Sequence, residues 1–92
     1  MNVRTEFPLQ STSQFGLYLR SLRRLRGLTQ GDLGERMGVT GARISEIERD
    51  PSAVGLTQVL RLLHVLGARI VLDVSDDSSK SETRISETRG EW

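Results

Sequence analysis

One stretch of the chain, TQGDLGERMGVTGARISEIE at 29–48, limits the possible folds more than any other part of the sequence. Thr29 and Asp32 have the spacing of a capping box, which predicts that a helix begins just after Thr29. Gly38 is expected to end this helix, and Thr40 to cap a second one. Both segments carry apolar residues at helical spacing: Leu33, Met37, Ile44 and Ile47. The pattern predicts two short amphipathic helices joined by a tight turn.

Two short helices joined in this way have the layout of a helix-turn-helix, whose second helix enters the major groove of DNA. Gly34 is small where the two helices would have to approach closely, and Val39 is expected to point inward from the turn. A helical hairpin used only for packing would not require so many matching positions. The segment therefore predicts DNA binding.

Longer helices are predicted on both sides of this unit. Ser13 is the expected N-cap of the first helix, Gly27 ends it, and Pro51 ends the third. The first helix carries this apolar stripe: Phe15, Tyr18, Leu19, Leu22 and Leu25. Its arginines lie off that stripe: Arg20, Arg23, Arg24 and Arg26. The fourth helix carries a wide apolar stripe: Leu56, Val59, Leu60, Leu63 and Leu66. Residues 13–67 are thus expected to form one helical domain.

Residues 68–74 change to the alternating, β-branched pattern of a strand. No second strand is predicted, and an isolated strand would leave its backbone groups unpaired. The same strand of a second copy, related by a two-fold axis, is the simplest partner. An axis through Val71 would pair Arg69 with Asp73, and Ile70 with Leu72, across the two copies. The sequence predicts a homodimer held by these residues.

The two ends of the chain are expected to lie outside the folded domain. Residues 1–12 are predicted to form a flexible arm. Residues 75–92 have only Ile85 and Trp92 as apolar residues, so burial cannot offset the entropy of ordering them. They include the near-repeat SETR at 81–84 and 86–89. We expect a disordered acidic tail that carries the only tryptophan, a residue typical of binding hot spots.

The net charge of +1 is unevenly distributed. Residues 1–72 have ten Arg and six Asp or Glu, a balance of +4, whereas residues 73–92 have three basic and six acidic residues, a balance of −3. Arginine suits the recognition of phosphates and of guanine edges. The basic part therefore fits DNA, and the acidic part suggests a different partner.

Other classes of function have little support. The chain has no cysteine, and its one histidine, His64, is predicted on the solvent side of a helix. No catalytic set or glycine-rich phosphate loop is complete, so we expect no enzyme, no metal and no cofactor. No signal peptide or membrane-spanning run is found, and a cytoplasmic protein bound to DNA is expected.

The motif T-Q-x-x-L-G-x-x-M-G-V-T-x-x-x-I-S-x-I-E resembles the Cro/C1-type (XRE) helix-turn-helix family. The resemblance implies a mainly α-helical, lambda-repressor-like domain that binds DNA. It also implies a phosphate contact by Gln30, with Arg23 and Arg49 as further candidates. The exposed start of the second motif helix would face the bases through these residues: Thr40, Gly41, Ala42, Arg43 and Ser45.

Arg43 is the leading candidate for reading a base, because a guanidinium can bond a guanine through two hydrogen bonds. The alternatives are a phosphate contact or an ion pair with Glu46 or Glu48. Gly41 replaces the polar residue common at this position of the family, which shifts recognition to Arg43 and to DNA shape. A dimer would read an inverted repeat, with half-sites about one helical turn, or a multiple of it, apart.

The strand after the fourth helix, and the tail with Glu91 and Trp92, resemble a narrower group, the HipB-type antitoxins. This resemblance implies a dimeric repressor of its own operon that binds and neutralises a HipA-type Ser/Thr kinase toxin. A C-terminal tryptophan can dock into the toxin in that family, a role that would fall to Trp92. Two alternatives remain open, a stand-alone phage-type repressor and an antitoxin to a different class of toxin.

Overall fold

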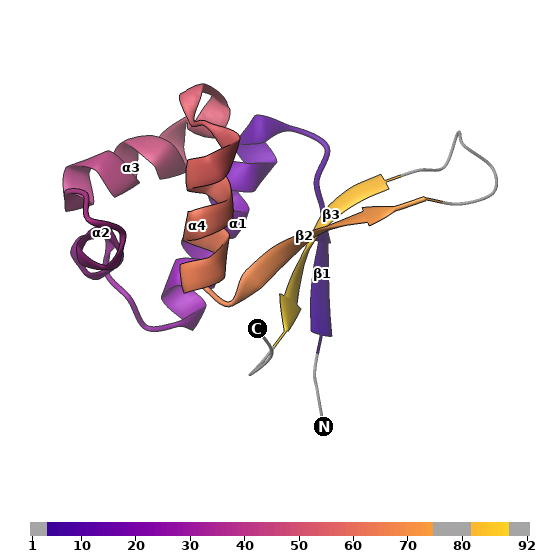
Figure 1. Cartoon of the computed structure of the whole chain (residues 1–92), viewed down its shortest axis with the longest axis horizontal. Helices are drawn as coiled ribbons and strands as arrows, with labels where there is room; N and C mark the ends of the chain where they lie inside the picture. Colours follow the sequence, from indigo (N-terminus) through magenta and orange to yellow (C-terminus); the bar gives the residue numbers. More distant parts are fainter. Residues whose placement is uncertain (1–3, 75–81, 89–92) are drawn as a thin grey trace.

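The computed structural model, described for residues 4–74 and 82–88, has a helical half beside a three-stranded sheet (Figure 1). Along the chain the elements are β1 (Arg4–Pro8), α1 (Thr12–Leu25), α2 (Gln30–Met37), α3 (Gly41–Arg49), the 3-10 turn η1 (Pro51–Ala53), α4 (Leu56–Val65), β2 (Ala68–Asp73) and β3 (Glu82–Thr88). The predicted mainly α-helical fold with four helices is confirmed.

Local hydrogen bonds fix where the helices begin. Thr29 and Asp32 form a complete capping box, in which each side chain accepts a backbone N–H of the other residue at 3.0 Å. The Thr29 backbone N–H, and after it the Thr29 hydroxyl, hold the pKa of Asp32 below its ordinary value. Thr40 caps α3 as predicted. The first helix begins earlier than expected, because Ser11 rather than Ser13 is its N-cap.

The turn between α2 and α3 depends on two glycines. Gly38 has a φ of 74°, a left-handed conformation that few other residues adopt without strain. A β-carbon on Gly34 would lie 2.6 Å from the carbonyl oxygen of Val39, which confirms the predicted close approach. The angle between the two helices of the motif is therefore set by backbone contact.

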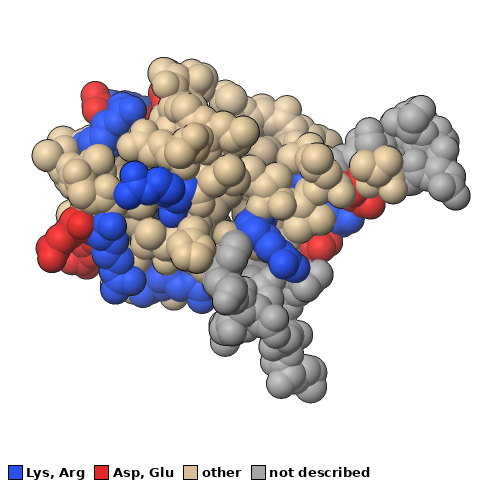
Figure 2. Space-filling view, in the orientation of Figure 1, with Lys and Arg blue, Asp and Glu red and all other residues tan. Residues whose placement is uncertain are grey.

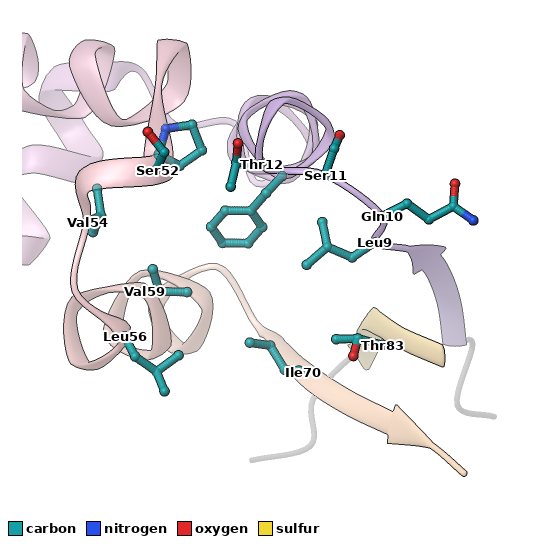
Figure 3. Close-up of a pocket in the computed structure, with 12 residues that line it drawn as sticks. Leu9, Gln10, Ser11, Thr12, Ser52, Val54, Leu56, Val59, Ile70 and Thr83 are labelled. Carbon is teal, nitrogen blue, oxygen red and sulfur yellow. The ribbon is translucent and has the colours of Figure 1, made fainter. Parts of the chain in front are cut away.

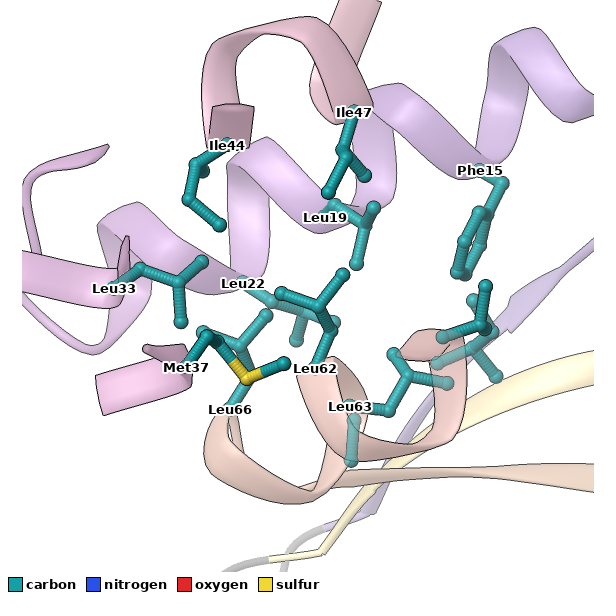
Figure 4. Packing of buried hydrophobic residues seen from close by; sticks show 13 residues of the cluster. Phe15, Leu19, Leu22, Leu33, Met37, Ile44, Ile47, Leu62, Leu63 and Leu66 are labelled. Atoms are coloured by element: carbon teal, nitrogen blue, oxygen red, sulfur yellow. The ribbon is translucent and has the colours of Figure 1, made fainter. Parts of the chain in front are cut away.

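A continuous apolar core lies between the helices and reaches the sheet (Figure 4). Its buried members are Phe15, Leu19, Leu22, Leu33, Met37, Ile44, Ile47, Val59, Leu62, Leu63, Leu66, Ala68 and Ile85. Three residues of the predicted stripes, Leu25, Leu56 and Leu60, are instead 52%, 66% and 48% exposed. On α4, Leu62 lies outside the predicted stripe and is buried in the core, so the buried face of that helix differs from the predicted one.

The sheet has the order β1-β3-β2, and both pairs of strands are antiparallel. The expectation of a single strand is thus wrong, because β2 pairs with β3 of the same chain. The segment 4–8, expected in a flexible arm, and the segment 82–88, expected in a disordered tail, are the other two strands. The mainly helical class is unaffected, but β2 does not need a second copy to find a partner strand.

Ile85 explains why β3 is ordered despite its polar sequence. It lies in register between Phe7 of β1 and Ile70 of β2, and its side chain is fully buried. On the opposite face of the sheet, Arg84 bonds Glu6 at 2.7 Å and Asp73 at 2.5 Å, so one guanidinium joins all three strands. One apolar row and one charge network together offset the cost of ordering the segment.

The N-terminal strand is held against the first helix by Tyr18. The Tyr18 hydroxyl donates to the carbonyl oxygen of Pro8 at 2.6 Å, and its ring lies 5.1 Å from the ring of Phe7. This separation is within the range of favourable aromatic pairs. The N-terminal strand is therefore attached to the helical half.

The hydrogen-bonding pattern shows which backbone groups of β2 face the free edge of the sheet. The Leu9 N–H donates to the Thr83 carbonyl oxygen at 2.9 Å, in the register of the β1–β3 pair. Hydrogen-bonded pairs alternate along antiparallel strands, so odd residues of β3 face β1 and even residues face β2. By register, Arg69, Val71 and Asp73 bond to β3. The backbone groups of Ala68, Ile70 and Leu72 consequently point to the outer edge of β2.

A buried ion pair joins the helices of the motif to α1. Arg23 of α1 donates to both carboxylate oxygens of Glu48 of α3, from Nε at 2.6 Å and from Nη2 at 3.2 Å. The remaining nitrogen, Nη1, donates to the Leu28 carbonyl oxygen at 2.9 Å. Gln30, at the start of α2, donates to the same carboxylate at 3.2 Å. Both charged residues are buried, so this cluster fixes three helices relative to one another.

We expect Glu48→Ala to lower the free energy of unfolding by about 3–5 kcal/mol, because it leaves the buried Arg23 guanidinium without its counter-charge. Urea denaturation followed by circular dichroism measures this change. Glu46→Ala is the matched control on the same helix, because Glu46 forms only an exposed ion pair with Arg43. It should change stability by about 0.5 kcal/mol or less. Equal effects of the two substitutions would show that burial of Glu48 does not matter.

Candidate DNA-binding surface

Helix α3 packs one face on the core and presents the other to solvent. Ile44 and Ile47 are buried, whereas Thr40 and Ala42 are exposed and Ser45 is half-buried. The outward side of the first turns of α3 is therefore formed by the residues that the sequence predicts to face DNA bases. Short side chains leave room for this helix to approach the floor of a major groove.

Gly41 is the exception among these residues, because it serves the packing of the motif. A β-carbon on Gly41 would lie 3.1 Å from both the Cα and the N of Gly31, closer than ordinary van der Waals contact. The start of α3 therefore lies directly against the start of α2. This close approach explains why a glycine stands where a polar residue is expected.

Arg43 is the long cationic side chain near the start of α3. Its Nη1 lies 3.7 Å from the Glu46 carboxylate, and the two side chains are 41% and 58% exposed. An exposed pair of this kind contributes about 0–1 kcal/mol, so Arg43 can exchange Glu46 for a stronger ligand at little cost. Glu48, the other carboxylate considered from sequence, is already engaged by Arg23.

The expected phosphate contacts differ in how accessible their side chains are. Arg23 is 7% exposed and all its guanidinium nitrogens bond within the protein, so the expectation of a phosphate contact by Arg23 is corrected. Gln30 is half-buried with its amide on Glu48, and Arg49 is exposed at the end of α3. Gln30 and Arg49 thus remain candidates.

Two further arginines of α1, which were not predicted as phosphate contacts, lie in a better position than Arg23. Arg20 and Arg24 line a polar hollow of about 630 Å³ beside Thr29 and Gln30, at the start of α2. A helix start carries a partial positive charge that favours anions. Arg24 is exposed, and the Arg20 side chain is 43% exposed. The sequence already indicated that both side chains are accessible, because their spacing places them off the apolar stripe of α1.

Basic side chains are also frequent on the surface of the helical half (Figure 2). On the face seen in Figure 2, basic side chains are spread along the helical half, and acidic side chains interrupt them at the end farthest from the sheet.

The described residues contain no group of three or more His, Cys, Asp or Glu that could hold a metal ion. Within the same residues, no helix is long and apolar enough to cross a membrane.

The residues predicted to join two copies lie along β2. Figure 1 shows this strand on the side of the helical half opposite to α2. Arg69 is exposed, Ile70 and Val71 are half-buried, and Leu72 is 69% exposed. Asp73 bonds Arg84 on the outer face of the sheet. Trp92, the predicted docking residue for a toxin, lies outside the described residues.

Comparison with known proteins agrees with this arrangement. A family model described as a helix-turn-helix domain matches residues 14–72, which cover most of α1, all of α2 to α4 and most of β2. No curated protein and no solved structure gives a significant match. Such domains bind DNA in a sequence-specific way through the second helix of the motif. The chain belongs to the helix-turn-helix domain family, of the XRE/Cro-type kind.

Proposed function

We propose that the protein is a transcriptional repressor that binds an inverted-repeat operator as a homodimer. The observation that supports this most is the outward face of α3, which is formed by Thr40, Ala42, Arg43 and Ser45. The buried ion pair between Arg23 and Glu48 holds this helix in place. A protein that recognises a DNA sequence must hold the few side chains that contact the bases in fixed positions. A repressor of this kind would act in the cytoplasm, where the DNA lies.

In this proposal the residues divide into two roles. Arg43 reads a guanine, while Thr40 and Ser45 make smaller contacts to neighbouring base edges. Gln30 and Arg49, together with Arg20 and Arg24, hold the phosphates on either side of the groove. The Glu46 carboxylate keeps Arg43 near its working position in the free protein.

Arg43→Ala should weaken binding to the operator by about 1–3 kcal/mol and relax the preference at one base pair. Arg49→Ala is the control, because loss of a phosphate contact should weaken binding to all sequences equally and lower the salt dependence. Fluorescence anisotropy with an operator selected from a random DNA library measures both effects. An equal loss on all sequences for Arg43→Ala would make Arg43 a phosphate contact.

The homodimer is proposed to form at the free edge of β2. The outward backbone groups there belong to Ala68, Ile70 and Leu72, so two β2 strands can pair only when even-numbered residues face each other. An axis through Val71 satisfies this condition, since it pairs Ile70 with Leu72 of a second copy. It also pairs Arg69 with Asp73, whose other contact is Arg84. The two sheets would form one continuous sheet of six strands.

Val71→Cys tests the dimer, because the chain has no cysteine of its own. Val71 residues at the axis form a non-hydrogen-bonded pair about 4.5 Å apart between Cα atoms, which suits a disulfide. We expect nearly complete cross-linking under mild oxidation, measured by non-reducing electrophoresis. Leu72→Cys, at a more exposed position, should cross-link poorly because its copies lie about 7–8 Å apart on the diagonal. Faster cross-linking through Leu72→Cys would rule out this register.

We further propose an antitoxin role, with a HipA-type Ser/Thr kinase as partner. The HipB-like combination of an XRE domain, a strand after the fourth helix and a tryptophan at 92 supports it. Trp92 stands four positions after Thr88, the last residue of β3, in the sequence. Four residues reach at most about 14 Å, so Trp92 would bind a partner that contacts the sheet.

Trp92→Ala should leave the operator affinity of the free dimer unchanged and weaken the kinase complex by about 30-fold, a typical hot-spot loss. Pull-down from the source cells, with the kinase identified by mass spectrometry and its affinity then measured by calorimetry, provides the test. A truncated chain that ends at Thr88 is tested beside Trp92→Ala. Truncation at Asp73 is unsuitable, because it would also remove the buried Ile85. Equal recovery of the kinase by all forms would exclude Trp92 as the docking residue.

Two other functions give different outcomes in the same experiment. A stand-alone phage-type repressor would recover no toxin, and Trp92→Ala would change nothing that is measured. An antitoxin to another class would recover a toxin without a kinase domain, such as a ribonuclease. Arg43→Ala is the complementary control, because it should lose the operator and keep the partner.

A further inference from the structure

An apolar groove of about 480 Å³ opens between the inner face of the sheet and the helical half (Figure 3). Apolar side chains from several elements of the chain line it, among them Leu9, Phe15, Val54, Leu56, Val59 and Ile70. Ile70 extends from β2 toward the space between the sheet and α4 (Figure 3). The groove is therefore adjacent to the free edge of β2.

Several large apolar side chains of α4 and of the β2 edge are left in water by the single chain. Leu56, which lines the groove, is 66% exposed, and Leu60, one turn further along α4, is 48% exposed. On β2 and directly after it, Leu72 is 69% and Val74 is 74% exposed. Exposed apolar side chains that adjoin an apolar groove are typical of an interaction surface.

The strand register identifies what can cover this surface. If two copies pair through the outward groups of β2 around Val71, Leu72 of one copy lies opposite Ile70 of the other. Side chains of directly opposed residues point to the same face, with Cβ atoms about 4.5–5.5 Å apart. Ile70 faces the groove, so the opposing Leu72 must lie at its mouth. The two-fold axis creates the same contact twice.

We propose that the groove is a site completed by Leu72 of a second copy, with Ile70 and Leu56 as its main contacts. This inference rests on the proposed homodimer and adds the contact that closes it. The two faces of the paired strands then have different chemistry. Arg69 and Asp73 form cross-copy ion pairs on the outer face, and Leu72 fills the groove on the inner face.

The contact would also fix the geometry of DNA recognition. Paired edges alone allow the two helical halves to twist about the strands. A Leu72 side chain held between β2 and the start of α4 ties the second copy to the helical half itself. The separation of the two α3 helices, and hence the half-site spacing, would depend on this contact.

Leu72→Thr tests the proposal, because threonine favours a strand but removes the apolar contact. We expect the dimer Kd to rise on the order of 100-fold, since two buried leucines are lost per dimer. Analytical ultracentrifugation of the full chain measures the Kd. Leu25→Thr is the matched control, an exposed leucine on α1 that does not line the groove, and its Kd should match that of the unchanged chain.

A second measurement locates the leucine directly. Copies carrying Leu72→Cys are mixed with copies carrying Leu56→Cys and treated with a short bis-maleimide. A mixed cross-linked dimer, together with the raised Kd, supports the proposal. A wild-type Kd for Leu72→Thr without the mixed cross-link overturns it, while the Val71→Cys disulfide would show that the dimer itself stands. A chain that stays monomeric at all concentrations overturns both.

Discussion

The buried ion pair between Arg23 and Glu48 is the interaction on which the rest of the structure depends. A carboxylate removed from water is stable only when its oxygens accept enough hydrogen bonds, and Glu48 receives them from Arg23 and from Gln30. These three residues belong to three different helices. This carboxylate, together with the backbone contacts at Gly34 and Gly41, fixes the position of α3 and so of the residues on its outward face.

The same interaction decides which residues remain available to DNA. Arg23 uses its guanidinium inside the protein, whereas Gln30 donates one amide N–H to Glu48 and has a second donor for a phosphate. Arg24 of α1 and Arg49 of α3 are exposed, and the side chain of Arg43 is 41% exposed, so these cations remain accessible beside the motif. A helix-turn-helix with few long polar side chains on α3 relies on exact placement of those it has. The glycine contact between Gly31 and Gly41 contributes to that placement.

The sheet lies at the end of the molecule away from α2 (Figure 1). Residues 4–8 and 82–88 come from opposite ends of the chain, and the pairing of β3 with both β1 and β2 attaches them to the helical half. This pairing leaves β2 at the edge, with its even-numbered residues directed outward. The proposed division of labour follows from this topology, with DNA at the helical motif and a second copy at the strand edge.

The sequence by itself determined the features that depend on neighbours a few residues away. The Thr29–Asp32 capping box, the Thr40 cap, the turn at Gly38 and the close approach at Gly34 were all predicted from spacing. The helical spacing of apolar residues likewise predicted the four helices. Together with the family resemblance, this spacing predicted which residues form the outward face of α3. These features are local, so the sequence contains both partners of each interaction.

Only the tertiary structure decided which residues meet over long distances in the chain. It buried Arg23 against Glu48, and it ordered Ile85 between Phe7 and Ile70 in a segment whose composition suggested disorder. It also rotated α4 so that Leu62 is buried while Leu60 is exposed. Periodicity allows either stripe of α4, and composition counts apolar residues without showing where they meet. The partners that approach in space make those choices, because burial depends on what covers a side chain.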